Sequence, residues 1–226
     1  MWAVVPLKNP AEAKQRLASV LTNAERAALM LAMIEDVLMA LKGANGLDGI
    51  LIVSRAPQAQ LFARRLDIDT FAEALGADLS EAVQAAGGYL MAKRDVTGTL
   101  IVPGDLPLIT SADVEAVLDQ HDQITLVPDL EGDGTNCIVS SPPNLIRYRF
   151  DGHSFKPHLD AAYAIGITPR IVRNDHFGLD IDSPDDLRTM ISRLAERSGP
   201  SATRTYIESS DIASRLMRPH NASTAV

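Results

Sequence analysis

Short apolar segments alternate with helical stretches along most of the chain, and this alternation constrains the fold more than any other feature. Six segments are predicted to be strands because they are apolar, short and bounded by turn-forming residues. They are Trp2–Pro6, Gly49–Ser54, Gly98–Pro103, Ile124–Val127, Cys137–Val139 and Pro169–Val172. Strands that alternate with helices are typical of an α/β fold with a mostly parallel sheet and helices on both faces.

The first long helix is marked by its capping residues. Thr22 and Glu25 have the spacing of a capping box, in which each residue satisfies a free backbone N–H of the first turn. Apolar residues then recur at helical spacing as far as about Lys42. We therefore predict a helix from Thr22 to about Lys42.

The last long helix has an equally clear start at residues 183–186, Ser-Pro-Asp-Asp. Serine is a preferred N-cap, proline suits the first helical position, and acids in the first turn complement the helix dipole. This pattern predicts a helix to about Glu196 and accounts for both of its acids. The preceding pair, Asp180 and Asp182, is left without a structural explanation.

Length and composition favour one globular domain. The chain has 226 residues, 46% of them hydrophobic, which is enough to bury a full core. We assign this domain to residues 1–196. From residue 197 to 226 the composition shifts to Ser, Thr, Arg, Pro and His, so a partly flexible tail or a short helix is expected there.

Charge and cysteine content exclude several classes of protein. The formal net charge is −8, which argues against a nucleic-acid partner because phosphate backbones are bound mainly through Lys and Arg. Cys137 is the only cysteine, so no internal disulfide forms. No apolar run approaches the ~20 residues that a membrane span needs. A cytoplasmic protein without a membrane partner is expected.

The segment Leu100–Leu108 carries the first functional signal. An apolar strand stops at Gly104-Asp105 and turns through a proline towards a helix near Ser111. Open α/β sheets bind ligands at the carboxyl ends of their strands, which is where Asp105 would lie. Asp180 and Asp182 alternate in an extended segment, so both point to the same side. Three converging carboxylates favour Mg²⁺ and a polyphosphate.

Cations follow the first predicted strand. Lys8, Lys14 and Arg16 lie in a loop that leads towards the first helix. Cations beside exposed backbone N–H groups suit a triphosphate. The loop contains no glycine, so it is neither a P-loop nor a dinucleotide fingerprint.

Two further segments place polar groups beside predicted elements. Thr135 and Asn136 end a turn-rich loop before a strand, and their donors suit a carboxylate or phosphate. Ser154 and His158 flank the start of a helical segment, Leu159–Ile165. Ser154 has two interpretations at this stage, the N-cap of that helix or a phosphate contact.

Taken together, the motifs resemble one known family, the CofC/FbiD guanylyltransferases of coenzyme F-420 biosynthesis. The motifs run in order as Pro-x-Lys-x5-Lys-x-Arg-Leu from Pro6, Gly-Asp-Leu-Pro from Gly104, Pro-Asp-x-x-Gly-x-Gly-Thr-Asn from Pro128, Ser-x3-His from Ser154 and Asp-x-Asp-x-Pro-x-Asp-Leu from Asp180. The resemblance spans Pro6 to about Leu187. It implies a single-domain nucleotidyltransferase fold of the nucleotide-diphospho-sugar transferase type.

By this resemblance, GMP passes from GTP to the phosphate of a three-carbon acid, and pyrophosphate leaves. The acid is 2-phospho-L-lactate, phosphoenolpyruvate or 3-phospho-D-glycerate. The partners are thus GTP and one such acid, and a homodimer or a hand-off to the next enzyme of the pathway are further expectations.

The resemblance also implies a role for each motif residue. Mg²⁺ would be held by Asp105, Asp180 and Asp182. The acid would be bound by Lys8, Thr135, Asn136, Ser154 and His158. The nucleotide would be bound by Lys14, Arg16, Ser54, Ser80 and Gly104. Among these, the residues expected to act directly in catalysis are Lys8, Lys14, Arg16 and Asp105.

Two positions depart from the family pattern. Asp151 stands near Ser154 where the family commonly has glycine, which changes the charge of the acid pocket. Ser80 follows Leu79 where the family often has asparagine, on the expected nucleotide side.

The expected chemistry needs no catalytic base. A phosphate monoester has a second pKa of ~6, so the attacking oxygen is already deprotonated at neutral pH. The barrier is repulsion between two anions, and it is lowered by positive charge at the site.

Three alternatives stay open on sequence alone. One is a nucleotidyltransferase for another phosphorylated acceptor, such as a molybdopterin or a sugar phosphate. The second is a nucleotide-binding module without catalysis, which the presence of all three carboxylates disfavours. The third is a metal-dependent glycosyltransferase, whose Asp-x-Asp usually lies mid-chain, unlike the pair at Asp180.

Overall fold

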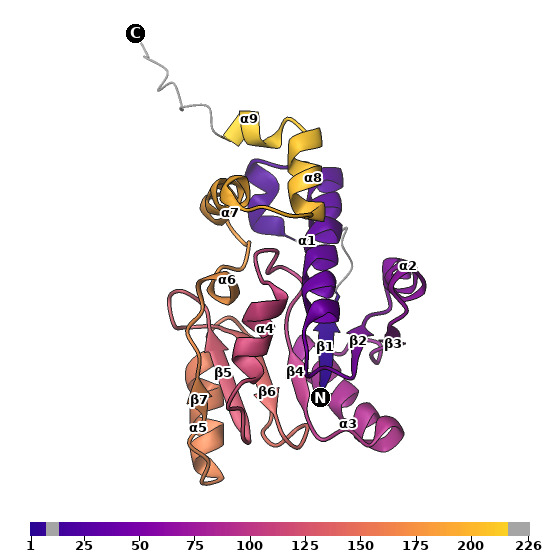
Figure 1. Cartoon of the computed structure of the whole chain (residues 1–226), viewed down its shortest axis with the longest axis vertical. Coiled ribbons are helices and arrows are strands. Elements are labelled where there is room, and N and C mark those ends of the chain that lie inside the picture. Colours follow the sequence, from indigo (N-terminus) through magenta and orange to yellow (C-terminus); the bar gives the residue numbers. More distant parts are fainter. Residues whose placement is uncertain (8–13, 217–226) are drawn as a thin grey trace.

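The computed structural model describes residues 1–7 and 14–216, which form a seven-stranded sheet flanked by helices (Figure 1). The strands are β1 (Trp2–Pro6), β2 (Gly49–Val53), β3 (Asp69–Phe71), β4 (Thr99–Ile101), β5 (Ile124–Pro128), β6 (Thr135–Ser140) and β7 (Arg170–Ile171). Their order across the sheet is β3-β2-β1-β4-β6-β5-β7. The predicted α/β fold with a mostly parallel sheet is confirmed.

The direction of β6 determines which residues share an edge of the sheet. β1 pairs in parallel with β2 and β4, and β5 pairs in parallel with β7. β6 runs antiparallel to both β4 and β5. The first residues of β6 therefore lie at the edge where β1, β4 and β5 end.

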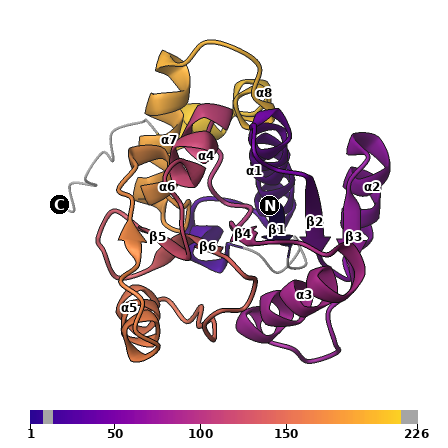
Figure 2. The same ribbon diagram turned by 60° about the horizontal axis from the view of Figure 1, so that its bottom comes forward.

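Helices cover both faces of the sheet (Figure 2), with α3 and α5 on one face and α1, α4 and α7 on the other. The helical elements are η2 (Gln15–Ser19), α1 (Asn23–Gly43), α2 (Pro57–Leu66), α3 (Leu79–Arg94), α4 (Ser111–Leu118), α5 (Phe155–Ala164), α6 (Asp175–Gly178), α7 (Pro184–Glu196), α8 (Ala202–Ser209) and α9 (Ile212–Leu216). None of these helices is both long and apolar enough to span a bilayer.

The alternation of side chains along β1 separates two hydrophobic cores. Ala3 and Val5 pack with α1 and α7, whereas Val4 packs with α3 and α5 on the opposite face. All three side chains are fully buried. Burial of a valine side chain contributes roughly 1.5–3 kcal/mol, so substituting a charged residue at any of these positions would disrupt a core.

The predicted helix starts are confirmed. Thr22 caps α1 in a reciprocal capping box with Glu25, and Ser183 caps α7 in the same way with Asp186. Asp186 accepts the Ser183 N–H at 2.6 Å, so its role at the helix start is structural, as predicted.

Three elements between residues 57 and 94 were not predicted. β3 has only three residues and lies at the edge of the sheet, and its sequence, Asp-Thr-Phe, lacks an apolar run. The start of α3 did carry a signal, since Asp78 and Glu81 form a capping box. α2 begins at Pro57, a residue suited to the first helical turn.

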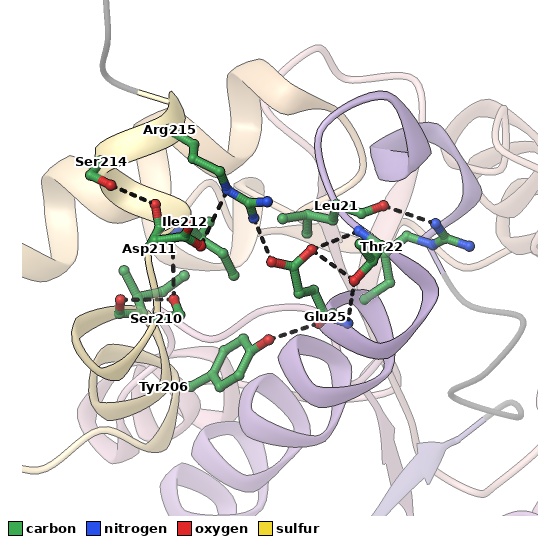
Figure 3. A network of polar contacts seen from close by, with 11 residues as sticks. Leu21, Thr22, Glu25, Tyr206, Ser210, Asp211, Ile212, Ser214 and Arg215 are labelled. Atoms are coloured by element: carbon green, nitrogen blue, oxygen red, sulfur yellow. Dashed lines mark hydrogen bonds and ion pairs between the residues drawn. The ribbon is translucent and has the colours of Figure 1, made fainter.

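Residues after 196 include two short helices that pack on α1 and α7. Ile207 and Ile212 are buried in the core cluster that also contains Ala3. Figure 3 shows the polar contacts that connect these helices to the start of α1: Arg215 forms an ion pair with Glu25, and Tyr206 Oη donates to the Glu25 carbonyl at 3.3 Å. The composition of this segment led us to expect a partly flexible tail or a short helix, and the structure has two short helices there, α8 and α9.

Candidate active site

The predicted functional segments meet at one edge of the sheet. Asp105 follows β4, Thr135 opens β6, and Asp180 and Asp182 precede α7. The Ile181 N–H donates to the Asp105 carbonyl at 3.2 Å, which joins two of these segments directly. Because β6 runs antiparallel, Thr135 lies beside the ends of its neighbours.

A cavity of about 540 Å³ lies at this edge, within the range expected of small-molecule sites. Its polar and charged lining residues are Arg16, Asp105, Asp129, Glu131, Asp133, Thr135, Asn136, Asp151, His153, Ser154, Asp180, Asp182 and Asp186. Carboxylates dominate this set, so an anionic ligand here requires added positive charge.

Gly104 allows the loop after β4 to approach α1 closely. A Cβ at this position would lie 2.9 Å from the side chain of Ile34 on α1. The glycine therefore has a packing role, and it places the next residue, Asp105, at the cavity wall. The structure brings Asp105, but not Gly104, into contact with the cavity.

Lys14 lies between two of the predicted metal ligands. Its Nζ donates to Asp105 Oδ2 at 2.6 Å and to Asp182 Oδ1 at 2.7 Å, and its side chain is only 6% exposed. Burial alone would lower the pKa of Lys14, but the two carboxylates outweigh it and raise the pKa above its usual value. Lys14 is thus held as a cation between Asp105 and Asp182.

The conformation of Lys14 is also unusual. Its φ of 56° and ψ of 44° place it in the left-handed region, where residues with a Cβ are strained. It forms the N-cap of η2 without a side-chain capping bond. The residue with this strained backbone is thus the one whose ammonium contacts both carboxylates. Backbone strain of this kind is concentrated at functional sites.

Two features indicate that the carboxylate cluster has capacity for a further cation. Asp105 Oδ1 is buried and has no hydrogen-bond partner among the residues that the structure describes. Burial, followed by the nearby charge of Asp105, raises the pKa of Asp180 to about 6, although Asn136 Nδ2 donates to its Oδ1 at 3.0 Å. An unpartnered oxygen and a destabilised carboxylate are both relieved by a cation.

The carboxylates are not arranged as a complete metal cage. Within residues 1–7 and 14–216, no group of three or more His, Cys, Asp or Glu side chains is placed to hold a metal ion. Mg²⁺ usually keeps several waters and takes one or two protein carboxylates together with substrate phosphates. The donor set therefore fits Mg²⁺ that arrives with a nucleotide better than a resident ion.

Thr135 and Ser154 form a hydroxyl pair on the cavity wall. The Thr135 N–H donates to Ser154 Oγ at 2.9 Å, which fixes the start of β6 to the start of α5. Ser154 occupies the N-cap position of α5 but makes no side-chain capping bond. Its hydroxyl instead accepts the Thr135 N–H and so positions Thr135. The structure therefore does not support the predicted role of Ser154 as a side-chain cap of this helix.

His158 lies behind this pair and does not line the cavity. It is fully buried, with Nδ1 3.0 Å from Thr135 Oγ1 and Nε2 2.9 Å from the Arg149 backbone nitrogen. Both ring nitrogens are thus engaged within the protein, and the contact of His158 with the substrate stays a prediction.

Asp151, which departs from the family pattern, is paired with a cation. Arg149 Nε donates to Asp151 Oδ2 at 2.5 Å, and this bond lowers the pKa of the Asp151 carboxyl. The pair is partly exposed, with Asp151 on the cavity wall. Its charge is therefore balanced locally by Arg149.

Other predicted site residues have structural contacts instead. Ser54 Oγ donates to the Leu7 carbonyl at 2.6 Å and accepts the Ala56 N–H at 3.0 Å, so it holds the end of β1 beside β2. Ser80 Oγ accepts the Phe150 N–H at 2.9 Å. Neither is among the residues that line the cavity, and their nucleotide contacts stay a prediction. Lys8 lies outside the described residues.

The sequence analysis did not identify several residues that shape the cavity. Asp129 accepts backbone N–H groups of Gly132, Asp133 and Gly134 at 2.6–2.9 Å and so organises the loop before Thr135. An aspartate followed by glycines at this spacing is a turn signal that points to such a role. Phe150 and Leu79 form an apolar part of the wall, for which no single-sequence motif exists.

Comparison with known proteins shows the family of the chain that contains this cavity. The family model for guanylyl transferases of the CofC-like type matches residues 1–213. The chain belongs to the CofC-like guanylyl transferase family. The match covers every segment that contributes to the cavity, as well as α8.

Similar proteins carry names that agree with this family. A phosphoenolpyruvate guanylyltransferase of Rubrobacter xylanophilus is 37% identical over 83% of this chain and 91% of its own length. A 2-phospho-L-lactate guanylyltransferase of Methanocaldococcus infernus is 29% identical over 94% of this chain and 92% of its own.

A solved structure confirms the fold expected of this CofC-like protein. It is the crystal structure of a protein from Desulfovibrio desulfuricans G20 assigned as a nucleotide-diphospho-sugar transferase, with a TM-score of 0.75. The two chains share 20% identity, over 95% of this chain and 96% of the other. The nucleotide-diphospho-sugar transferase-like fold is thus confirmed.

Proposed function

We propose that this chain transfers GMP from GTP to the phosphate of 2-phospho-L-lactate or phosphoenolpyruvate in the biosynthesis of coenzyme F-420. One observation carries the proposal: in a CofC-like chain, a cluster of carboxylates, two of them paired with Lys14, lines the same cavity as a hydroxyl pair. The cluster suits a metal-bound triphosphate, and the pair suits a small phosphorylated acid. The names of similar proteins support both substrates.

In the proposed reaction, an oxygen of the acid's phosphate attacks the α-phosphorus of GTP. A new P–O–P bond forms, the bond between the α- and β-phosphates breaks, and its electron pair leaves with pyrophosphate. The attacking oxygen carries no proton at neutral pH, because the second pKa of a phosphate monoester is ~6. No base is required, which fits a cavity whose wall, within the described part of the chain, has His153 as its only histidine, a side chain 86% exposed.

Of Asp105, Asp180 and Asp182, one or two carboxylates at a time would hold Mg²⁺ together with the phosphates of GTP, and the ion would supply positive charge there. The fit rests on the unpartnered Asp105 Oδ1 and on the raised pKa of Asp180. Asn136 would hold the Asp180 carboxylate through the hydrogen bond at 3.0 Å already present.

Lys14 has two positions in this proposal. In the structure its Nζ neutralises Asp105 and Asp182. If these carboxylates held a metal ion, the Lys14 ammonium would be available to a phosphate of GTP. Arg16, whose side chain is 79% exposed at 3.9 Å from Asp182, is proposed to bind the outer phosphates of GTP.

The acid is proposed to bind at Thr135 and Ser154. Hydroxyl donors suit the carboxylate and phosphate oxygens of a small acid, and Lys8 is proposed to add a cation there. Asp151 lies on the cavity wall, and its ion pair with Arg149 is proposed to determine how much negative charge the acid meets there.

The proposal is tested by mass spectrometry of the products formed from GTP, Mg²⁺ and an equimolar mixture of 2-phospho-L-lactate, phosphoenolpyruvate and 3-phospho-D-glycerate. A guanosine diphospho-acid and an equal amount of pyrophosphate are expected, with phospholactate or phosphoenolpyruvate as the acceptor. Molybdopterin and sugar phosphates serve as comparison acceptors. Exclusive use of either of these, or of phosphoglycerate, would refute the acceptor assignment.

A further inference from the structure

His158 is a buried group that the proposed chemistry does not use. Its side chain is fully buried behind Thr135 and packs edge-on against Phe150, with 5.3 Å between the ring centroids. Both ring nitrogens are within hydrogen-bond distance of a named partner. A buried histidine behind the cavity wall can affect a ligand only through the residues that it contacts. Its hydrogen-bond partners therefore show what role it has.

The hydrogen bonds determine which ring nitrogen carries the proton. The partner of Nε2, at 2.9 Å, is the backbone N–H of Arg149, which can only donate. Nε2 must therefore accept, and the neutral ring carries its proton on Nδ1. Burial favours this neutral form, lowering the pKa of His158 to about 4 against the opposing charge of Asp151.

The tautomer in turn determines the direction of the Thr135 hydroxyl. Nδ1–H donates to Thr135 Oγ1 at 3.0 Å, so this oxygen accepts from the histidine and its own proton must point elsewhere. Ser154 Oγ likewise accepts the Thr135 N–H at 2.9 Å. Each hydroxyl of the pair uses a lone pair within the protein, and its proton is left to donate to a ligand.

We propose that His158 is a positioning residue that holds the Thr135 hydroxyl as a hydrogen-bond donor to the phosphorylated acid. The proposal rests on the proposed function, which places the acid at Thr135 and Ser154. It suits the acid end of the cavity to anionic oxygens, because each hydroxyl of the pair has a proton to donate to them. His158 itself touches neither substrate.

The tautomer is read directly from ¹⁵N NMR of the imidazole nitrogens in the wild-type protein, with His158→Gln used to assign the signals. A neutral ring with the proton on Nδ1 at neutral pH is expected. A proton on Nε2, or a charged ring, would overturn the proposal whether or not the protein is active.

The effect on the acid is measured as separate KM values for acid and GTP. His158→Gln, which removes the donor at the Nδ1 position, should reduce kcat/KM for the acid by about 10- to 100-fold, the range for loss of one hydrogen bond to a charged group, with the KM for GTP unchanged. Thr135→Val should have the same effect, and the double variant should lose no more than either single variant.

His158→Asn is the matched control, because its amide places a donor near the position of Nδ1. It should recover most of the loss seen in His158→Gln. Unchanged acid kinetics in a folded His158→Gln variant, additive losses in the double variant, or equal losses for both substrates would each overturn the proposal. Absence of turnover with every acid would instead refute the proposed function, since the NMR result stands apart from it.

Discussion

Substituting Lys14 by methionine should destabilise the protein in a way that Mg²⁺ repairs. Lys14 Nζ lies 2.6 Å from Asp105 Oδ2 and 2.7 Å from Asp182 Oδ1 and is almost fully buried. Without the Lys14 ammonium, the carboxylates of Asp105 and Asp182 lie close together with no cation between them. Methionine keeps the length of the side chain and the left-handed backbone, so the substitution removes the charge and little else.

The size of the effect follows from this geometry. Breaking a buried ion pair costs about 3–5 kcal/mol because a charge is left unpaired. The Asp182 side chain is 44% exposed, so water screens part of this cost, and we expect a loss of about 2 kcal/mol. In a domain of this size, that lowers Tm by about 4–8 °C.

The assay is thermal unfolding of Lys14→Met and wild type in EDTA and in millimolar Mg²⁺, without nucleotide. Mg²⁺ should raise the Tm of the variant and have little effect on the wild type, whose Lys14 already neutralises both carboxylates. Arg16→Met is the control, since Arg16 is 79% exposed and 3.9 Å from Asp182, and it should change stability by less than about 0.5 kcal/mol. An unchanged Tm of Lys14→Met in EDTA, or equal stabilisation of both proteins by Mg²⁺, would refute the reasoning.

Three further predictions concern the carboxylates. Asp105→Asn should abolish pyrophosphate release while leaving the Tm within a few degrees, because a proposed metal ligand is lost but Lys14 keeps its ion pair with Asp182; normal turnover would remove Asp105 from the proposed metal site. Asp180→Asn should stabilise the metal-free protein at pH 7. The folded pKa of about 6 exceeds the usual 3.8, so the folded state binds more protons and the free energy of unfolding of the wild type falls as pH rises from about 4 to 6. The Asp180→Asn variant lacks this loss, so its free energy of unfolding in urea should exceed that of the wild type by on the order of 1–3 kcal/mol at pH 7 and by nothing near pH 4. A higher free energy of unfolding at both pH values would contradict the raised pKa of Asp180. Asp151→Gly, which frees Arg149 and removes a possible acceptor of a substrate hydroxyl, should shift relative kcat/KM towards phosphoenolpyruvate and away from phosphoglycerate, and unchanged ratios would make Asp151 a turn residue only.

The parts of the fold that sequence predicted are those set by local patterns. Buried strands such as β1 and β2 were predicted nearly to the residue, because an apolar run between turn formers has few alternatives. The capping residues Thr22 and Ser183 located the starts of α1 and α7. The edge strand β3 was missed because only three partly buried residues pair there, and its existence depends on β2.

The candidate site was likewise predicted only where local sequence patterns specify it. Asp105, Asp180 and Asp182 were predicted from their positions before turns and helices, and they line one cavity. The ion pairs of Lys14 were not predicted, because they join residues 91 and 168 positions apart. The burial of His158 behind Thr135 depends on the antiparallel direction of β6, which no local pattern specifies.

The central claim is that the acid's own phosphate is the nucleophile and that the protein supplies charge and position. The most direct test is the pH dependence of kcat/KM, measured with acceptors whose second phosphate pKa differs. The acidic limb should follow the acceptor's pKa, near ~6, and should persist in His158→Gln. An acidic limb that is the same for every acceptor and disappears in His158→Gln would show that the enzyme uses a base, and would contradict the account.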